Sequence, residues 1–353
     1  MSRLEKGFSL VEMLVALVLG LVLFTGVGHL VLASNKSWVL QDELARIQEN
    51  ARLALDILSQ DIRSAGYTGC PPQASLANAL YTDSDNRRWM MHFDKGILGI
   101  PFWGSSDESV IGHLDSNAIS EAIVVHSIDQ ARAIAVRGHD EGTATVTLAS
   151  EHSFDEGDLL ALTSRNCKQV SVFRGGSATA GSSVSHPAGN SGSLYNCTSL
   201  LQGHYNCHTS TIGADKLNDQ DGVLSPLQSR AFYLRNSNGV PTLYRKRAGE
   251  YTSGNSINAE ALVEGIERLN LRYGVDSDLD GVANQYLSAS DIGLYSSDWQ
   301  KVVSVKLELL ARSFSEVAPQ PQVYFFGGQK VTPADQYVRR SFMTTIELRN
   351  RGL

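Results

Sequence analysis

The chain has 353 residues, of which 42% are apolar and 19% are charged, and its formal net charge at pH 7 is −7. This is the composition of an ordinary globular protein, long enough for one large domain or two smaller ones. The acidic balance, with no cluster of Lys and Arg, argues against a nucleic-acid-binding protein. We therefore expect no nucleic acid among its partners.

The N-terminal segment predicts a membrane-spanning helix. Residues 1–7 are polar and include Arg3 and Lys6, whereas residues 8–33 are almost wholly apolar. At 1.5 Å per residue this run would measure ~39 Å as a helix, enough to cross a hydrocarbon core of ~30 Å. Positive charges before the span favour a cytoplasmic N-terminus and an exported remainder. A secretory signal peptide would have a shorter apolar run followed by its cleavage site.

A carboxylate lies inside this apolar run, at Glu12. Ionisable residues within membrane spans are costly and are functional by default. The segment from Lys6 through Gly7 and Phe8 to Glu12, followed by the apolar run, resembles the cleavage site of type IV prepilins. The resemblance implies that a prepilin peptidase cuts after Gly7 and methylates the new N-terminus at Phe8. An uncleaved signal anchor is the alternative, and it leaves Glu12 unexplained.

Cleavage at this site would make Glu12 the fifth residue of the mature chain. We expect its carboxylate to pair with the ammonium group of Phe8 in a neighbouring subunit, because desolvation in a helical bundle strengthens that attraction. Glu12 would then set the register of subunit assembly. Residues 1–7 would be a leader that is absent from the assembled protein.

Beyond the membrane span, the helical pattern continues over residues 34–65. Apolar side chains recur at steps of three and four, which predicts one apolar stripe on an amphipathic helix. These are Leu40, Leu44, Ile47, Ala51, Leu55, Leu58 and Ile62. Gly66 and the Cys70-Pro71-Pro72 segment end the pattern. We therefore expect one continuous helix from about Phe8 to Arg63.

Residues 66–353 predict a β-rich head. Short alternating runs suggest strands, and Asn238-Gly239 is a strong hairpin signal. In residues 302–310 the alternation predicts a strand with one face turned inward. The Gly/Ser/Ala-rich stretch 175–193 is expected to be a surface loop. The predicted fold class is α+β and pilin-like, with a long N-terminal α-helix packed on a large β-rich C-terminal head.

Several head segments resemble the PilW family of minor pilins. They are Asp61–Tyr67, GVPTLYR at 239–245, LVEGIERLNLRYGVDSDLDG at 262–281, WQKVV at 299–303 and RRSFMTTIELRNR at 339–351. The resemblance implies a minor pilin that helps to initiate type IV pilus assembly near the fibre tip. Its partners would be the prepilin peptidase, other minor pilins, the major pilin and a tip adhesin. It would reside in the inner membrane with a periplasmic head and then in the fibre at the cell surface.

Two other functions fit the same N-terminus. A type II secretion pseudopilin carries the same cleavage site, although the tyrosine- and strand-rich C-terminal part favours the pilus. A signal-anchored periplasmic enzyme or receptor is the third reading. An enzyme needs a convergent catalytic group, and the sequence has neither a GxSxG nor an HExxH motif. We therefore expect a structural protein rather than an enzyme.

The chain has four cysteines, and an even number in an exported chain suggests two disulfides. Three connectivities are open. We favour Cys197 with Cys207, which closes a short loop and leaves Cys70 with Cys167. A zinc site formed by these two close cysteines with His204 and His208 is disfavoured in an oxidising compartment.

One acidic segment is a candidate calcium loop. Asp276, Asp278 and Asp280 alternate before Gly281, as in the first half of a calcium-binding loop. The Val282 carbonyl and the Asn284 side chain would be the next ligands. The twelfth position is Leu287 instead of a bidentate glutamate, so a distant carboxylate, Asp291 or Asp298, would have to complete the site. The alternative is an acidic turn without an ion, and no other cofactor is expected.

Overall fold

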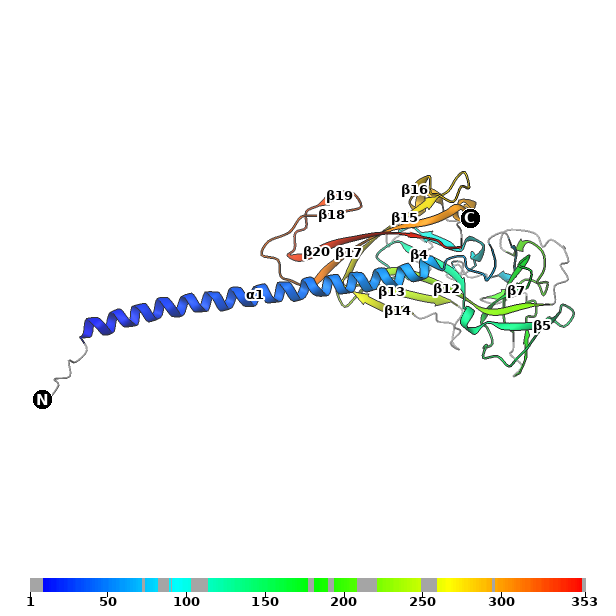
Figure 1. Cartoon of the computed structure of the whole chain (residues 1–353), viewed down its shortest axis with the longest axis horizontal. Coiled ribbons are helices and arrows are strands. Elements are labelled where there is room, and N and C mark those ends of the chain that lie inside the picture. The colour runs from blue at the N-terminus through cyan, green and yellow to red at the C-terminus, as the bar shows by residue number, and fades with distance from the viewer. Residues whose placement is uncertain are drawn as a thin grey trace.

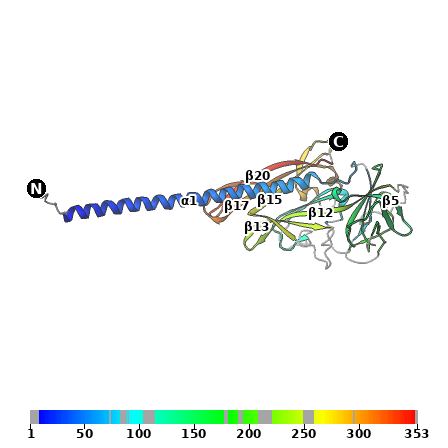
Figure 2. The ribbon, with the colours of Figure 1, turned by 60° about the horizontal axis from the view of Figure 1, so that its bottom comes forward.

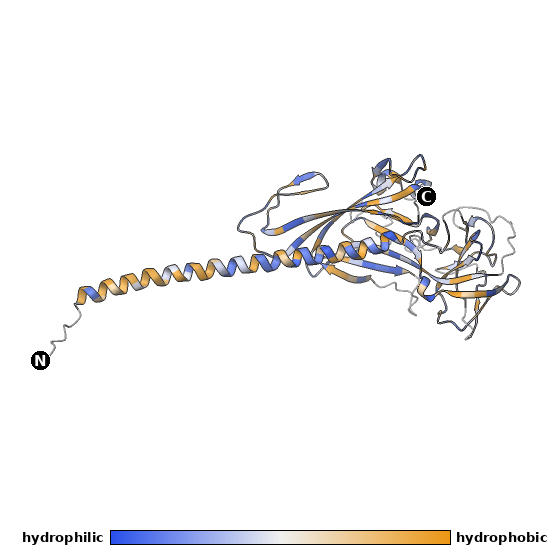
Figure 3. Ribbon diagram, viewed as in Figure 1, coloured by the Kyte–Doolittle hydropathy of each residue, from blue (hydrophilic) through white to orange (hydrophobic). Residues whose placement is uncertain are grey.

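A computed structural model of the protein describes residues 9–71, 74–81, 89, 91–102, 114–176, 181–189, 194–207, 221–248, 259–293 and 296–350. Helix α1 (Leu10–Arg63) extends from one end of a β-rich head (Figure 1). Its first half is apolar and stands free of the head (Figure 3), and by length and composition it can cross a membrane. The expected single helix and β-rich head are therefore confirmed. Gly7 and Phe8 lie outside the described residues.

The end of α1 is fixed by the turn that follows it. Gly66 has a φ of 72°, a left-handed conformation that suits glycine and stops the helix. Its N–H donates to the carbonyl of His126 at 2.8 Å. The helix therefore ends on the strand β4 (Ala122–Ile128), at the position that the sequence predicted.

The stripe predicted to be apolar does face the head. Five residues on this side of α1 are at most 2% exposed: Ile47, Ala51, Ala54, Leu58 and Ile62. Three more from the predicted stripe pack against them while partly exposed: Leu40, Leu44 and Leu55. Burial of this stripe, at ~25 cal/mol per Å² of apolar surface, holds the second half of the helix on the sheets.

Around α1 lies the first part of the head, which we call the helix-packed lobe. A four-stranded antiparallel sheet has the order β16-β15-β17-β20, and α1 packs against β17 and β20. These strands are β15 (Ile266–Val275), β16 (Gln285–Leu287), β17 (Val302–Glu316) and β20 (Tyr337–Glu347). A second group of strands completes the lobe: β3 (Ile97–Ile100), β4, the last part of β12 (Gly222–Ser237), β13 (Val240–Ala248) and β14 (Ala259–Glu264).

The second part of the head, the distal lobe, lies beyond the end of α1 (Figure 2). Its strands follow the order β11-β1-β8-β7-β12-β5-β6-β9. Their bounds are β1 (Ser75–Asn78), β5 (Ile134–Asp140), β6 (Thr145–Leu148), β7 (Leu159–Ser164), β8 (Gln169–Arg174), β9 (Ser183–Ser185) and β11 (Tyr205–Asn206). The lobe has its own apolar core, which includes Leu160, Phe173 and Leu224. The expected single head therefore contains two cores.

Strand β12 joins the two lobes. Its first residues, Gly222–Pro226, pair with β7, and Leu227–Phe232 pair with β4. The rest of β12 forms a hairpin with β13, closed where Ser237 pairs with Val240. Asn238 and Gly239 both have positive φ, as a two-residue turn of this kind requires. The predicted hairpin is therefore confirmed.

The remaining elements are short. The strands β2 (Leu80–Tyr81) and β10 (Tyr195–Asn196) pair with each other, as do β18 (Tyr324–Phe326) and β19 (Gln329–Val331). The short helices are η2 (Phe93–Lys95), η3 (Gln130–Arg132), α3 (Ala289–Ile292) and η4 (Ser297–Lys301).

One expectation for the head was wrong. Part of the stretch expected to be a surface loop is the strand β9, because Val184 and His186 insert into the core of the distal lobe. The predicted inward face of β17 is buried at Val305 and Leu307, and Glu308 on the opposite face is buried as well. The Glu308 carboxylate accepts hydrogen bonds from the N–H of Gly327 and the hydroxyl of Ser341. The β18–β19 hairpin thus covers this face of the sheet.

Candidate functional site

The free half of α1 is the largest exposed apolar surface among the described residues. Leucine, valine and phenylalanine side chains from Leu10 to Leu32 are more than half exposed. A β-carbon added at Gly20, Gly26 or Gly28 would meet nothing within 4 Å. A continuous apolar surface of this length does not stay in water and marks a site for lipid or for other apolar helices.

Glu12 lies in the first turn of this helix and is exposed. Its Oε2 accepts a hydrogen bond from the backbone N–H of Ser9 at 3.0 Å. A carboxylate at this position satisfies one of the free N–H groups of the helix start and interacts favourably with the helix dipole. The only charged side chain between Leu10 and Leu32 is therefore turned back toward the N-terminal end of the chain.

The acidic loop between β15 and β16 brings its three aspartates together. Carboxylate oxygens of Asp276, Asp278 and Asp280 lie within 4.8 Å of one another. Asp276 is buried and accepts the N–H groups of Leu279 and Gly281 at 2.7 and 2.8 Å. Asp278 and Asp280 are exposed. The geometry fits a divalent cation held by oxygen ligands, although Asp280 already accepts the N–H of Val282 at 2.8 Å.

Electrostatics of the acidic loop depend on the backbone. Burial alone would raise the pKa of Asp276, but the N–H groups that point at its carboxylate hold the pKa below its usual range. The carboxylate therefore stays ionised at neutral pH without an ion.

The other candidate ligands of this loop are less well placed. Asn284 uses its Oδ1 to accept the N–H of Ser277 at 2.6 Å. Asp291 bonds to Ser288 and Asp298 pairs with Lys301, and neither belongs to the cluster of three aspartates. Neither of the distant carboxylates expected to complete the site is thus brought to it. Val282, whose carbonyl was expected to bind, lies in the same loop.

Both disulfides join the pairs that the sequence favoured. Cys70 is bonded to Cys167 with the Cα atoms 5.2 Å apart, and Cys197 is bonded to Cys207. The first bond ties the segment after α1 to the turn between β7 and β8. Because both cysteines of the second pair are in the disulfide, they are not free to hold zinc with His204, and His208 lies outside the described residues.

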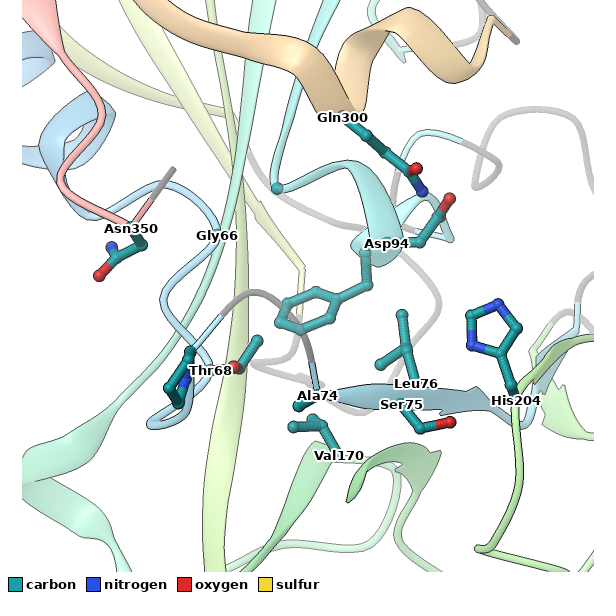
Figure 4. Close-up of a pocket in the computed structure, with 13 residues that line it drawn as sticks. Gly66, Thr68, Ala74, Ser75, Leu76, Asp94, Val170, His204, Gln300 and Asn350 are labelled. Atoms are coloured by element: carbon teal, nitrogen blue, oxygen red, sulfur yellow. The ribbon is translucent and has the colours of Figure 1, made fainter. Parts of the chain in front are cut away.

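A cavity of about 590 Å³ opens between the end of α1, η2, β1 and η4. Figure 4 shows Asp94, Gln300 and His204 toward one side of it and Asn350 toward the other. The hydroxyl of Ser75 in the cavity wall donates to the carbonyl of Gly203. None of the described hydrogen bonds joins this serine to His204.

Two buried carboxylates on the packed side of α1 were missed by the sequence pattern. Glu43 accepts the N–H of Phe314 on β17 at 2.8 Å. Asp61 pairs with Arg230 on β12, and the side chains are 12% and 20% exposed. Burial raises the pKa of Asp61 despite the opposing charge of Arg230. One feature of the sequence could have identified Asp61: it lies three positions after Leu58, at the spacing of the apolar stripe.

Comparison with protein families agrees with this architecture. Residues 231–350 match the family of type IV pilus-assembly protein W, PilW, and residues 2–28 match the prokaryotic N-terminal methylation motif. The two matches support a PilW-like type IV minor pilin. The PilW match runs from β12 to the end of β20 and so covers most of the helix-packed lobe. These pilin matches indicate a structural protein.

More distant comparisons add little. A type IV-like pilin, TTHA1219 from Thermus thermophilus, aligns over 87% of this chain and 98% of its own, with 9% sequence identity and a TM-score of 0.32. A TM-score this low supports no conclusion of its own. No curated protein matches the sequence.

Proposed function

We propose that this PilW-like chain is cut after Gly7, methylated at Phe8 and assembled through α1 into the first subunits of a type IV pilus. One observation carries the proposal. A single helix links a wholly exposed apolar half, next to the methylation motif, to a half that is packed into the PilW-matching lobe. The exposed half is suited first to the inner membrane and then to the packed helices of the fibre.

Glu12 would guide each subunit into register. Cleavage would create an ammonium group on the residue before Ser9, and Glu12 already turns its carboxylate to the Ser9 N–H. In the dry interior of a helical bundle an unpaired carboxylate is strongly disfavoured. A subunit would therefore be held where its Glu12 meets an ammonium group of a neighbour.

The head would be periplasmic and the N-terminus cytoplasmic before assembly, with the head at the cell surface afterwards. The partners we propose are the prepilin peptidase, other minor pilins, the major pilin and an adhesin at the tip. Both disulfides fit an oxidising compartment outside the cytoplasm.

The first test is the intact mass and N-terminal sequence of the chain from cells with and without prepilin peptidase. We expect methylated Phe8 at the N-terminus only when the peptidase is present. A chain that still begins at Met1 in both strains would contradict the proposal and favour a signal-anchored periplasmic protein. Glu12→Ala should be processed normally but enter fibres poorly, while Glu12→Asp should retain part of the function.

Deletion of the gene separates the two kinds of pilin system. Loss of surface pili and of twitching motility is expected for a pilus subunit. Loss of enzyme secretion with normal pili would instead identify a type II secretion pseudopilin.

We further propose that the loop from Asp276 to Asn284 binds calcium weakly. The three converging carboxylates support this ligand class. Calorimetric titration of the full chain in detergent should show heat with calcium, and Asp278→Asn should remove it. Asp298→Asn, outside the cluster, is the matched control. Equal heats for the two variants, or none for the unaltered chain, would count against the site.

A further inference from the structure

The outer edge of β20 is open. Among the described strands, β20 pairs only with β17 and ends the four-stranded sheet. Residues 341–346 read Ser-Phe-Met-Thr-Thr-Ile, with no charge, proline or glycine. Natural edge strands are usually blunted by such residues, since an open edge is a template for another strand. This edge lacks that protection.

The hydrogen-bonding groups of this edge can be assigned from the ladder. Leu348 donates its N–H to the carbonyl of Val303. In an antiparallel pair, alternate residues bond to the partner, so Phe342, Thr344 and Ile346 also turn toward β17. Ser341, Met343, Thr345 and Glu347 therefore present their N–H and C=O groups to the open edge. Met343 is also 56% exposed.

The C-terminal end of β20 borders a groove. This groove of about 620 Å³ runs between α1 and the end of β20. Its wall on the helix includes Leu55, Ser59 and Arg63, and its wall on the sheet side includes Thr344 and Arg349. Arg63 and Arg349 are exposed and have no ion pair among the described residues. Asp56 also lines the groove, so Arg63 and Arg349 leave it with a net positive charge, located at the end farthest from the membrane span.

The membrane-spanning half of α1 limits which strand can pair with β20. Strand β20 runs in the same direction as α1 (Figure 1): it starts beside β17 near Glu43, and Asn350 at its end bonds to the carbonyl of Ala65. Antiparallel pairing of β20 with β20 of a second copy would point the two α1 helices in opposite directions. Two such chains could not sit in one membrane with the same orientation, so an antiparallel incoming strand comes from a different segment.

We propose that the open edge of β20 accepts an extended strand from a different pilin subunit of the same fibre. This strand runs antiparallel to β20 and carries an acidic residue near its N-terminal end. That residue lies against Arg63 and Arg349 and supplies the missing charge. The main chain provides most of the attraction, as in other cases of strand addition. The identity of the partner as a fibre subunit rests on the proposed function.

The test uses the full-length chain in cells that assemble fibres. A photo-reactive p-benzoylphenylalanine replaces Ser341, Met343 or Thr345 in turn, and Phe325, which is 65% exposed on the β18–β19 hairpin, in the control. We expect cross-links from the three β20 sites to one extended segment of another pilin, mapped by mass spectrometry. As the probe moves from 341 to 345, the cross-linked position should move toward the N-terminus of that segment. The control should not label it.

A backbone variant tests the mechanism independently of the side chain. Met343→Pro removes an outward N–H without removing a bond to β17, and Met343→Ala keeps that N–H. Cross-linking from Thr345 should fall by roughly tenfold with proline, the effect of losing one hydrogen bond at a buried edge, and stay near normal with alanine. Protease resistance of the head in membranes checks that the proline variant is folded.

The outcomes separate this inference from the proposed function. Cross-links to β20 of a second copy, to a helix, or in the parallel direction would overturn it. So would a chain that begins at Phe8 and enters fibres but gives no cross-link at the β20 sites. A chain that keeps Met1 and is absent from fibres would overturn the proposed function, and the proposed partner with it.

Discussion

The two lobes of the head are stabilised in different ways. The helix-packed lobe has long strands, with 16 residues in β12, 15 in β17 and 11 in β20. It also buries the stripe of α1 and large side chains such as Trp299 and Tyr273. In the distal lobe the strands other than β12 have at most 7 residues, and several have only 2 to 4. Both disulfides attach to this lobe.

This difference follows from the size of each core. A small core gains little from apolar burial and needs covalent links to offset chain entropy. The lobe around α1 is stabilised by packing, and it is also the lobe that the PilW match covers. The distal lobe supplies a surface at the far end of the subunit on a frame of short strands. Measurements that perturb one lobe at a time test whether the helix-packed lobe depends on packing and the distal lobe on its disulfides.

The largest effect is expected from removing the disulfides. Replacing Cys70 and Cys167 by serine frees a loop that spans 97 residues, and replacing Cys197 and Cys207 frees one of 10. The chain-entropy model gives losses of about 5 and about 3 kcal/mol. Hydrogen exchange should rise in β7 and β8 and much less in β15 and β17. Equal exchange in both lobes would show that the distal lobe does not depend on these links.

The next effect concerns the contact between α1 and β12. Asp61→Ala removes the carboxylate partner of the partly buried Arg230, which keeps its hydrogen bond to Gln228, and should cost about 3–5 kcal/mol of unfolding free energy. Asp61→Asn keeps an acceptor for the guanidinium group and should cost less. Urea unfolding of both variants in detergent, followed by the fluorescence of buried Trp299, measures the difference. A loss near that of a surface pair, below about 1 kcal/mol, would mean that water reaches this ion pair.

The Asp61–Arg230 ion pair is an example of a contact that the sequence alone does not predict. Helix α1, the hairpin at Asn238-Gly239 and strand β4 follow from local patterns. Asp61 and Arg230 are 169 residues apart, and no local pattern joins them. The same holds for Glu43 and Phe314. Contacts of this kind depend on the tertiary fold.

The full length of β12 does not follow from the sequence, because Pro226 interrupts its pattern. Pro226 is the last residue that pairs with β7, and Leu227 is the first that pairs with β4. A proline needs no N–H partner where a strand leaves one ladder for another. Strands of two or three residues, such as β9 and β11, carry too few positions to show a period. For the candidate sites, the sequence found the three clustered aspartates and Glu12 but not the open edge of β20, which is a property of the sheet order.

A third prediction compares two glycines in the two lobes. A β-carbon at Gly99 in β3 would lie 2.5–2.7 Å from three atoms of the buried Tyr273 ring, which packs edge-on against Trp299. Gly99→Ala should therefore cost about 1–3 kcal/mol. A β-carbon at Gly138 in β5 would meet nothing within 4 Å, so Gly138→Ala should change stability by less than about 0.5 kcal/mol. Equal urea midpoints for the two variants would mean that the helix-packed core accommodates an added methyl group as easily as the surface of the distal lobe does.

The smallest effect is a pH dependence from the distal core. Burial, with the nearby His139, lowers the pKa of His186 to about 3, and its Nε2 lies 2.9 Å from the Nε2 of His139. In the unfolded chain a histidine has a pKa of about 6.5. Between these two values only the unfolded state takes up the proton, so the stability contributed by neutral His186 is present above about pH 6.5 and is lost as the pH falls toward 3.

The charged neighbours of His139 and His186 change the size of this pH dependence but not its direction. Burial also lowers the pKa of His139, and Glu141 and Asp140 act in the opposite direction. His186 alone should account for about 1.4 kcal/mol of the stability difference between pH 7.5 and 5.5. His186→Gln cannot take up a proton and should remove that part, as measured by hydrogen exchange of β8 and β9 at the two pH values. If the stability difference between pH 7.5 and 5.5 is unchanged in the variant, His186 is protonated in the folded lobe. Water then reaches this core in spite of its burial.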